Sequence, residues 1–306
     1  MTSIDVHQLT KAYGTPRAVD RLSFRVRPGS VTGFLGPNGA GKSTTMRLVL
    51  ALDRPTGGTA TIGGRPYAQL AEPLRTVGAL LDAQAAHGSR TPRSHLSVLA
   101  ASNGIAASRV EAVLEETGLA DVGARRIKTF SLGIAAALLG DPAVVMLDEP
   151  SNGLDPEGII WIRELMKRLA REGRTVLVSS HLMNETASFA DHLVVLGRGR
   201  LLADLPMREF LDSRSRPRVH LRTTEQARLR SALATRGLTA AQAEDGRWAI
   251  DGVTAEAIGT LAADEGIPLL ELADERATLE QAYLALTSDD TPFAASTTST
   301  RQEARP

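Results

Sequence analysis

A glycine-rich segment near the N-terminus carries the residue pattern that binds nucleotide phosphates. It satisfies G-x-x-x-x-G-K-[ST] and lies between an apolar, strand-like segment and a helix-like one, as such loops require. Small residues let successive backbone N–H groups surround a β-phosphate, and the helix N-terminus adds positive potential. We expect Lys42 to bridge the β- and γ-phosphates and the Ser43 hydroxyl to ligate Mg²⁺. The predicted nucleotide-binding residues of this loop are Gly36, Asn38, Gly39, Ala40, Gly41, Lys42, Ser43 and Thr44. Kinases and GTPases share such loops, so the motif indicates a nucleotide without deciding the function.

Carboxylates and a histidine follow two further apolar segments. Asp148 and Glu149 come directly after 144–147, where one carboxylate is placed to hold Mg²⁺ and the other to polarise an attacking water. Two ordinary turn acids would give the same letters, because acidic residues before a proline are common in turns. His181 follows the apolar segment 175–179. Taken alone, it would be interpreted as a capping or core histidine.

The elements that must position these residues alternate between strands and helices. We predict strands at 31–35, 143–147 and 175–179, and helices at 44–52 and 158–172. Strands without polar alternation, spaced by helices, favour a mostly parallel sheet covered on both faces. Two earlier segments, Ile4–His7 and Leu22–Val26, alternate between apolar and polar residues like half-buried strands. The sequence from about 94 to 140 is rich in Ala and Leu and predicts helices. The fold class is therefore α/β.

The composition restricts the class of protein further. Lys plus Arg and Asp plus Glu both number 35, so the net charge is zero, and we expect no nucleic-acid partner. The absence of cysteine excludes disulfides, thiolate metal sites and cysteine nucleophiles. No stretch reaches the roughly 18 apolar residues of a membrane span, and the first residues lack the pattern of a signal peptide. We therefore expect a chain that is not itself a transmembrane pore.

A second pattern begins after residue 217. Strand 218–223, helix 225–236, two strands around Asp245-Gly246, helix 254–265, strand 267–272 and helix 277–287 predict a small βαββαβ-like α+β domain over 218–287. It carries no catalytic constellation. Residues 288–306 are rich in Ser, Thr and Asp, and we predict that they are disordered.

Taken together with the segments 151–155 and 178–181, the two motifs closely resemble the nucleotide-binding domains of ABC transporters over residues 1–212. The resemblance implies a P-loop NTPase fold whose helical subdomain spans about 83–140. It also implies ATP and Mg²⁺ as cofactors, Asp148 as a metal ligand, and Glu149 and His181 as the catalytic residues. By the same resemblance, Tyr13 stacks on adenine and Asp155 belongs to the D-loop.

The segment 52–56, the turn at 153–156 and the appended domain are similar to ABC-2-type exporter ATPases of the drug-resistance kind. Membership of that group implies an ATPase that energises a separate permease for export of a small molecule or drug. It further implies a second copy of the chain in an ATP sandwich, at the cytoplasmic face of the plasma membrane. A DNA-repair or translation protein is disfavoured, because the chain has one cassette and no basic surplus.

Two positions depart from the ABC pattern. Where the family has the Q-loop glutamine, this chain has Asp82, whose oxygen could still assist the metal or the water; Gln84 is the second choice. In the signature segment, Ser131 and Gly133 match the residues that reach the partner's γ-phosphate, but roughly six residues are missing after them. Such a deletion removes about 9 Å of helix and rotates its face by about 120°.

From this deletion we expect ATP to bind while closure and hydrolysis are weakened. The alternative is that the local loop compensates and nothing is lost. A further alternative is a hydrolysis-impaired nucleotide-binding subunit that regulates such a transporter.

Overall fold

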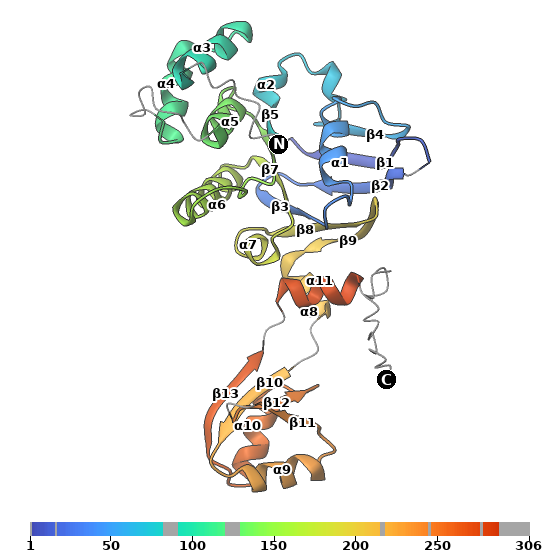
Figure 1. The fold of residues 1–306 in the computed structure, drawn as a ribbon, viewed down its shortest axis with the longest axis vertical. Coiled ribbons are helices and arrows are strands. Elements are labelled where there is room, and N and C mark those ends of the chain that lie inside the picture. The colour runs from blue at the N-terminus through green and yellow to red at the C-terminus, as the bar shows by residue number, and fades with distance from the viewer. Residues whose placement is uncertain are drawn as a thin grey trace, which may run out of the picture.

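The computed structural model describes residues 2–15, 17–81, 91–119, 129–214, 218–243, 246–275 and 278–287. We call residues 2–214 the larger unit and residues 218–275 the smaller unit. Figure 1 shows them as two bodies. The predicted tail at 288–306 lies outside the described residues, so its disorder stays a prediction.

The larger unit is built on a six-stranded sheet of the predicted, mostly parallel kind. Five neighbouring strands run parallel, and the edge strand β9 is antiparallel to β8. In sheet order the strands are β5 (Val77–Leu80), β6 (Val144–Asp148), β7 (Thr175–Ser180), β3 (Ser30–Leu35), β8 (His192–Gly197) and β9 (Arg200–Pro206). Every residue of β7 is buried, because other elements cover the sheet on both faces.

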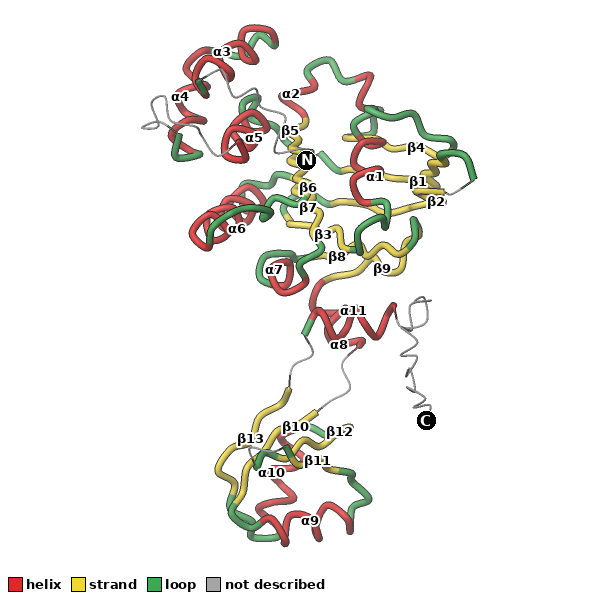
Figure 2. Tube along the Cα trace, in the orientation of Figure 1, coloured by secondary structure: helices red, strands yellow, loops and turns green. Residues whose placement is uncertain are grey.

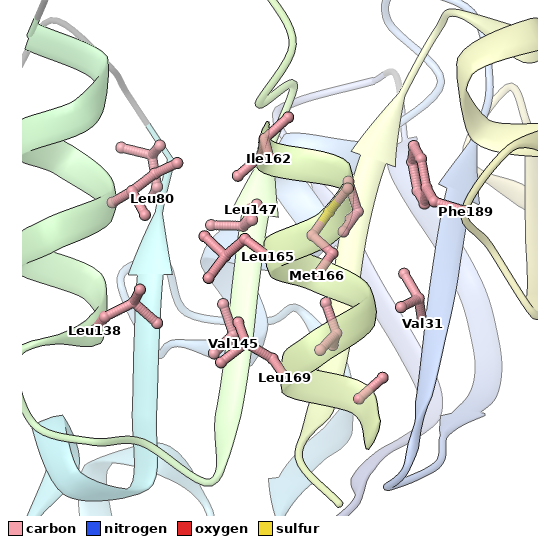
Figure 3. Packing of buried hydrophobic residues seen from close by; sticks show 14 of the residues in the cluster. Val31, Leu80, Leu138, Val145, Leu147, Ile162, Leu165, Met166, Leu169 and Phe189 are labelled. Carbon is pink, nitrogen blue, oxygen red and sulfur yellow. The ribbon is translucent and has the colours of Figure 1, made fainter. Parts of the chain in front are cut away.

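Alternate residues of β6 supply the two cores of this unit. Val145 and Leu147 belong to one apolar cluster, whereas Val144 and Met146 belong to the other. On the first face, α6 (Pro156–Arg171) presents Leu165 and Leu169 to these strand residues (Figure 3). The other face packs against α1 (Lys42–Val49) and a three-stranded antiparallel sheet. That sheet consists of β2 (Arg17–Val26), β1 (Ile4–Ala12) and β4 (Gly57–Ile62).

Shorter helices complete the larger unit. Three of them gather beside β5, where the sequence predicts a helical subdomain (Figure 2). They are α3 (Pro92–Ser102), α4 (Ala107–Glu116) and α5 (Thr129–Leu138). The rest are α2 (Pro73–Thr76), a 3-10 turn at Tyr67–Gln69, α7 (Met183–Ala187) and α8 (Met207–Arg214). Within the described residues, every helix is too short or too polar to span a lipid bilayer.

The smaller unit is a four-stranded antiparallel sheet with two helices against one face. Its sheet order is β11-β12-β10-β13, with every neighbouring pair antiparallel. In chain order the elements are β10 (Arg218–Thr223), α9 (Gln226–Thr235), β11 (Ala240–Gln242), β12 (Trp248–Asp251), α10 (Ala255–Asp264) and β13 (Leu269–Glu275). This is the split βαβ arrangement. Val219, Leu221 and Ile250 face the helices, because they alternate with polar residues along their strands.

The last helix, α11 (Leu279–Thr287), differs from the sequence prediction. The sequence assigns it to the C-terminal domain, but its buried residues Leu279 and Ala282 belong to the core of the larger unit, in one cluster with Phe210 of α8. It packs against α7 and α8. The helix returns to the larger unit because the two helices of the smaller unit already cover the apolar face of that sheet. The larger unit therefore also includes α11, and the smaller unit is inserted between α8 and α11.

Candidate functional site

Three predicted segments start from one edge of the large sheet. The strands β6, β7 and β3 are neighbours, with Asp148 paired to Ser179 and Leu35 paired to Ser180. The loop at 36–41, the pair Asp148-Glu149 and His181 therefore leave the sheet side by side, at the carboxyl ends of parallel strands. Ligands of such sheets bind at this edge. We call these three segments the nucleotide edge.

Backbone geometry explains the glycines of the loop. Gly41 has φ +99°, and a Cβ there would lie 2.4 Å from the Ala18 carbonyl oxygen. At Gly36 a Cβ would lie 2.7 Å from the Leu196 carbonyl oxygen. Neither position tolerates a side chain without moving backbone. Asn38 and Gly39 are exposed, whereas Ala40 is buried in the core beneath the loop.

Lys42 is the buried cation of this edge. Its side chain is 6% exposed, and its Nζ donates a hydrogen bond of 2.7 Å to the Gly36 carbonyl oxygen. The same Nζ lies 3.4 Å from Glu149 Oε1. A buried ammonium requires such partners, since an unpaired one is costly. The neighbouring Ser43 is exposed and Thr44 is half-buried, both in the first turn of α1, where backbone N–H groups favour an anion.

Glu149 joins the lysine and the histidine. Its Oε2 lies 2.7 Å from His181 Nδ1, so the carboxylate contacts Lys42 with one oxygen and His181 with the other. Its backbone has φ +50°, an uncommon conformation outside glycine, and its N–H donates to Ser179 Oγ over 3.0 Å. Positive φ and a specific hydrogen bond turn the side chain towards the phosphate loop.

Ser179 is a residue that the sequence analysis did not select as part of the site. Its hydroxyl donates to Asp148 Oδ1 and accepts from the Glu149 N–H, so it orients both acids. The only signal in the sequence is a serine near the end of a mostly apolar strand, two residues before His181. Such a signal is too common to be chosen on its own.

The remaining predicted residues lie away from this cluster or outside the described residues. Tyr13 is 54% exposed just after β1, with its hydroxyl 3.3 Å from Asp53 Oδ2 and Lys11 Nζ 4.9 Å from its ring centre. A hydrogen bond from Arg47 lowers the pKa of Asp53, so this carboxylate stays charged beside the tyrosine. Asp155 caps α6 and accepts from the Gly158 N–H over 3.0 Å. Asp82 and Gln84 lie outside the described residues.

The segment predicted as the signature, around Ser131 and Gly133, is helical in the structure. Ser131 and Gly133 lie in the first two turns of α5, whose described residues begin at Thr129. A Cβ on Gly133 would meet Leu80 Cδ1 at 2.6 Å, so this glycine lets α5 approach β5 closely. Downstream, Ile134 and Leu138 are buried in the main core. The described part of the helix therefore packs an apolar face against the core. The predicted roles of Ser131 and Gly133 towards a partner's phosphate stay predictions.

Known protein families match segments of both units. The family described as ABC transporter matches residues 19–152. A family described as an AAA domain, putative AbiEii toxin, Type IV TA system, matches residues 128–187, and a domain of unknown function matches 217–280. The chain is 31% identical over 306 residues to a daunorubicin resistance ATP-binding protein of Streptomyces coeruleorubidus, covering 94% of this chain and 97% of that one.

A second relative is the bacitracin transport ATP-binding protein of Bacillus licheniformis, 37% identical over 234 residues, with 74% of this chain and 76% of that protein covered. Among solved structures, the ATP-binding subunit of an ABC transporter matches with a TM-score of 0.61 and 25% identity, covering 69% of this chain and 92% of that one. A dimeric ATP-binding cassette in a post-hydrolysis state, bound to ADP and Pi, has a TM-score of 0.60 at 22% identity, covers 67% of this chain and 99% of that one, and shows the fold alone.

Proposed function

The chain belongs to the ABC transporter family, and from that membership we propose the roles of its individual residues, its metal ion and its partners. It is an ATP-binding subunit that hydrolyses ATP and energises a separate membrane permease for the export of a small molecule or drug. The observation that carries the residue assignment is the convergence of Lys42, Glu149 and His181 at the nucleotide edge.

The phosphate loop binds the ATP phosphates through the backbone N–H groups of 38–43 and the Lys42 ammonium. In this assignment Lys42 exchanges its contact with Glu149 for the β- and γ-phosphates, which frees the carboxylate. Tyr13, which carries an exposed ring after β1, stacks on adenine.

A magnesium ion fits the oxygen donors at this edge. The Ser43 hydroxyl and the Asp148 carboxylate are hard ligands on packed elements, α1 and β6, and Ser179 orients the carboxylate. Such a sparse set is typical of Mg²⁺ bound together with substrate phosphates. When bound, the ion neutralises charge on the phosphate oxygens. We place Asp82 as a further oxygen near the metal or the attacking water.

Glu149 is the general base that accepts a proton from the attacking water, and His181 contacts the γ-phosphate. Ser131 and Gly133 act on ATP held by a second copy of the chain, and Asp155 belongs to the loop between the two copies. The sandwich closes because ATP has a higher affinity for the closed state, and it reopens after hydrolysis. The pair of copies works beneath the permease at the cytoplasmic face of the plasma membrane.

The cargo class follows from the relatives named for bacitracin transport and daunorubicin resistance, so we propose an antibiotic or a similar small molecule. Neither relative is named as a regulatory subunit, and the hydrolysis-impaired alternative therefore has no support from these comparisons.

The test is steady-state ATP hydrolysis by the full chain beside Glu149→Gln. We expect turnover in the variant to fall by about 10²–10⁴, the usual contribution of a general base, with ATP binding retained and an ATP-dependent dimer accumulating in size-exclusion chromatography. The matched control is Glu164→Gln, an exposed carboxylate on α6. Equal turnover in the wild type and Glu149→Gln, with and without the permease, would contradict the assignment.

A further inference from the structure

A pocket lies in the smaller unit, far along the chain from the nucleotide edge. It opens between α9 and the β11–β12 hairpin, on the side of the sheet that the helices cover, and has a volume of about 350 Å³. This is the lower end of the range for small-molecule sites, about 300–1,000 Å³. Its walls include the aliphatic side chains of Leu233, Leu238 and Ala240 and the indole of Trp248.

Two residues that line the pocket, Trp248 and Arg230, carry polar groups for which the described part of the structure shows no hydrogen bond or ion pair. Trp248 is 3% exposed, and its indole Nε1 is buried without a hydrogen-bond partner among the described residues. A buried donor of this kind is normally paired. Arg230 is exposed at the rim, with its guanidinium 5.4 Å from the centre of the Trp248 ring. It forms no ion pair with any described residue, whereas Arg218 and Arg247 of the same unit each contact a carboxylate.

The combination identifies the chemistry of the ligand. An aliphatic and aromatic wall favours a flat apolar body. A guanidinium that stacks on an aromatic ring and forms no ion pair with a described residue favours a carboxylate, which it can bind through two parallel hydrogen bonds. A single arginine with no lysine in the lining suits one negative charge rather than a polyphosphate. An acceptor atom on the ligand would also satisfy the Trp248 N–H.

We propose that this pocket binds a small aromatic carboxylate, with Arg230 on the carboxylate and the apolar ring against Leu233 and Trp248. The site is separate from the nucleotide edge and does not depend on the roles proposed there. The proposal gives the inserted smaller unit a binding role, although its sequence shows no group of catalytic residues.

The experiment titrates the full chain with 3-phenylpropionate and, as a neutral match in shape, 3-phenylpropionamide. The readout is the indole N–H resonances in ¹H–¹⁵N spectra, where the two tryptophans, Trp161 and Trp248, are told apart by a Trp161→Phe variant. We expect saturable binding of the carboxylate that moves the Trp248 signal and leaves Trp161 in place. The amide should bind at least about tenfold more weakly.

Arg230→Gln should lower the affinity for 3-phenylpropionate by at least about tenfold, because it removes the positive charge and keeps an exposed polar side chain. Arg236→Gln is the control, since Arg236 lies at the end of the same helix and outside the pocket lining. Three results would overturn the proposal: no saturable shift of Trp248, equal affinity in Arg230→Gln, or binding that saturating ATP abolishes. The last would assign the probe to the phosphate loop.

Discussion

At the nucleotide edge of the larger unit, the ion pair of Lys42 and Glu149 is largely buried. On the open sheet face of the smaller unit, the ion pair of Arg218 and Asp251 is more exposed and joins two strands. Lys42 and Glu149 are 6% and 21% exposed and contact each other, and Glu149 also contacts His181. Arg218 and Asp251 are 44% and 58% exposed and lie opposite each other on β10 and β12. Burial of charge is costly unless partners or a ligand balance it. The first arrangement therefore indicates chemistry, and the second is typical of a solvated sheet face.

Lys42→Ala tests the role of the buried charge at the nucleotide edge, where we expect the largest effect. Removing the buried ammonium should abolish tight ATP binding and reduce turnover by about two to three powers of ten, because a preorganised charge at the phosphates is lost. Nucleotide binding by equilibrium dialysis and steady-state phosphate release are the measurements. Lys167→Ala, a half-buried lysine on α6, serves as the control and should keep wild-type turnover. A Lys42→Ala protein with normal ATP affinity would refute the phosphate assignment.

Leu279→Ala tests where one unit ends and the other begins. Leu279 is 1% exposed in the core of the larger unit, so truncation should lower the free energy of unfolding of that unit by about 2–4 kcal/mol. Trp161 lies on α6 and Trp248 on β12, so single-tryptophan variants report the two units separately during urea unfolding. We expect only the Trp161 transition to move. Leu284→Ala, at a position 58% exposed on the same helix, should change neither transition. If Leu279→Ala shifted only the Trp248 transition, α11 would have to be assigned to the smaller unit.

The two units also differ in how much the sequence predicts. The phosphate loop, Asp148, Glu149 and His181 are recognisable because the loop pattern and the ends of apolar strands fix their positions along the chain. The six elements of the smaller unit are equally predictable from periodicity, and the observed strand β13 extends only three residues beyond its predicted end. Periodicity shows that an element has an apolar face, but it does not show which other element that face packs against. The same pattern therefore allowed α11 to be assigned to the wrong unit.

Side-chain contacts between residues far apart in the sequence could not be predicted either, because periodicity does not identify packing partners. Ser179 orients both acids through hydrogen bonds that depend on strand register, and Gly133 has a packing role against Leu80 that depends on the approach of α5 to β5. Neither register nor approach can be derived from spacing along one segment. The pocket beside Trp248 likewise requires the β11–β12 hairpin to lie against α9.

His181→Ala compares two histidine–carboxylate pairs of equal length. His181 lies 2.7 Å from Glu149 at the nucleotide edge, and His192 lies 2.7 Å from Asp204, where β8 pairs with β9. Turnover should fall by about 10- to 100-fold in His181→Ala, because the proposed contact of His181 with the γ-phosphate is removed, and should stay within about threefold in His192→Ala. Both are measured at saturating ATP, with thermal unfolding as a check on folding. Equal losses in the two variants would mean that the contact at the nucleotide edge is merely structural.

Arg218→Gln carries the smallest expected effect and tests the other side of the comparison. The hydrogen bond with Asp251 raises the pKa of Arg218, yet both side chains are substantially exposed, so solvent and salt screen their attraction. We expect the free energy of unfolding reported by Trp248 to fall by less than about 1 kcal/mol, with ATP turnover unchanged. The difference between variant and wild type should shrink further in about 1 M salt, where the Debye length is about 3 Å. Arg222→Gln, an exposed arginine on the same strand, is the control. A salt-independent loss above about 2 kcal/mol would mean that these pairs are shielded from solvent by something that covers the sheet face, and the contrast with the nucleotide edge would fail.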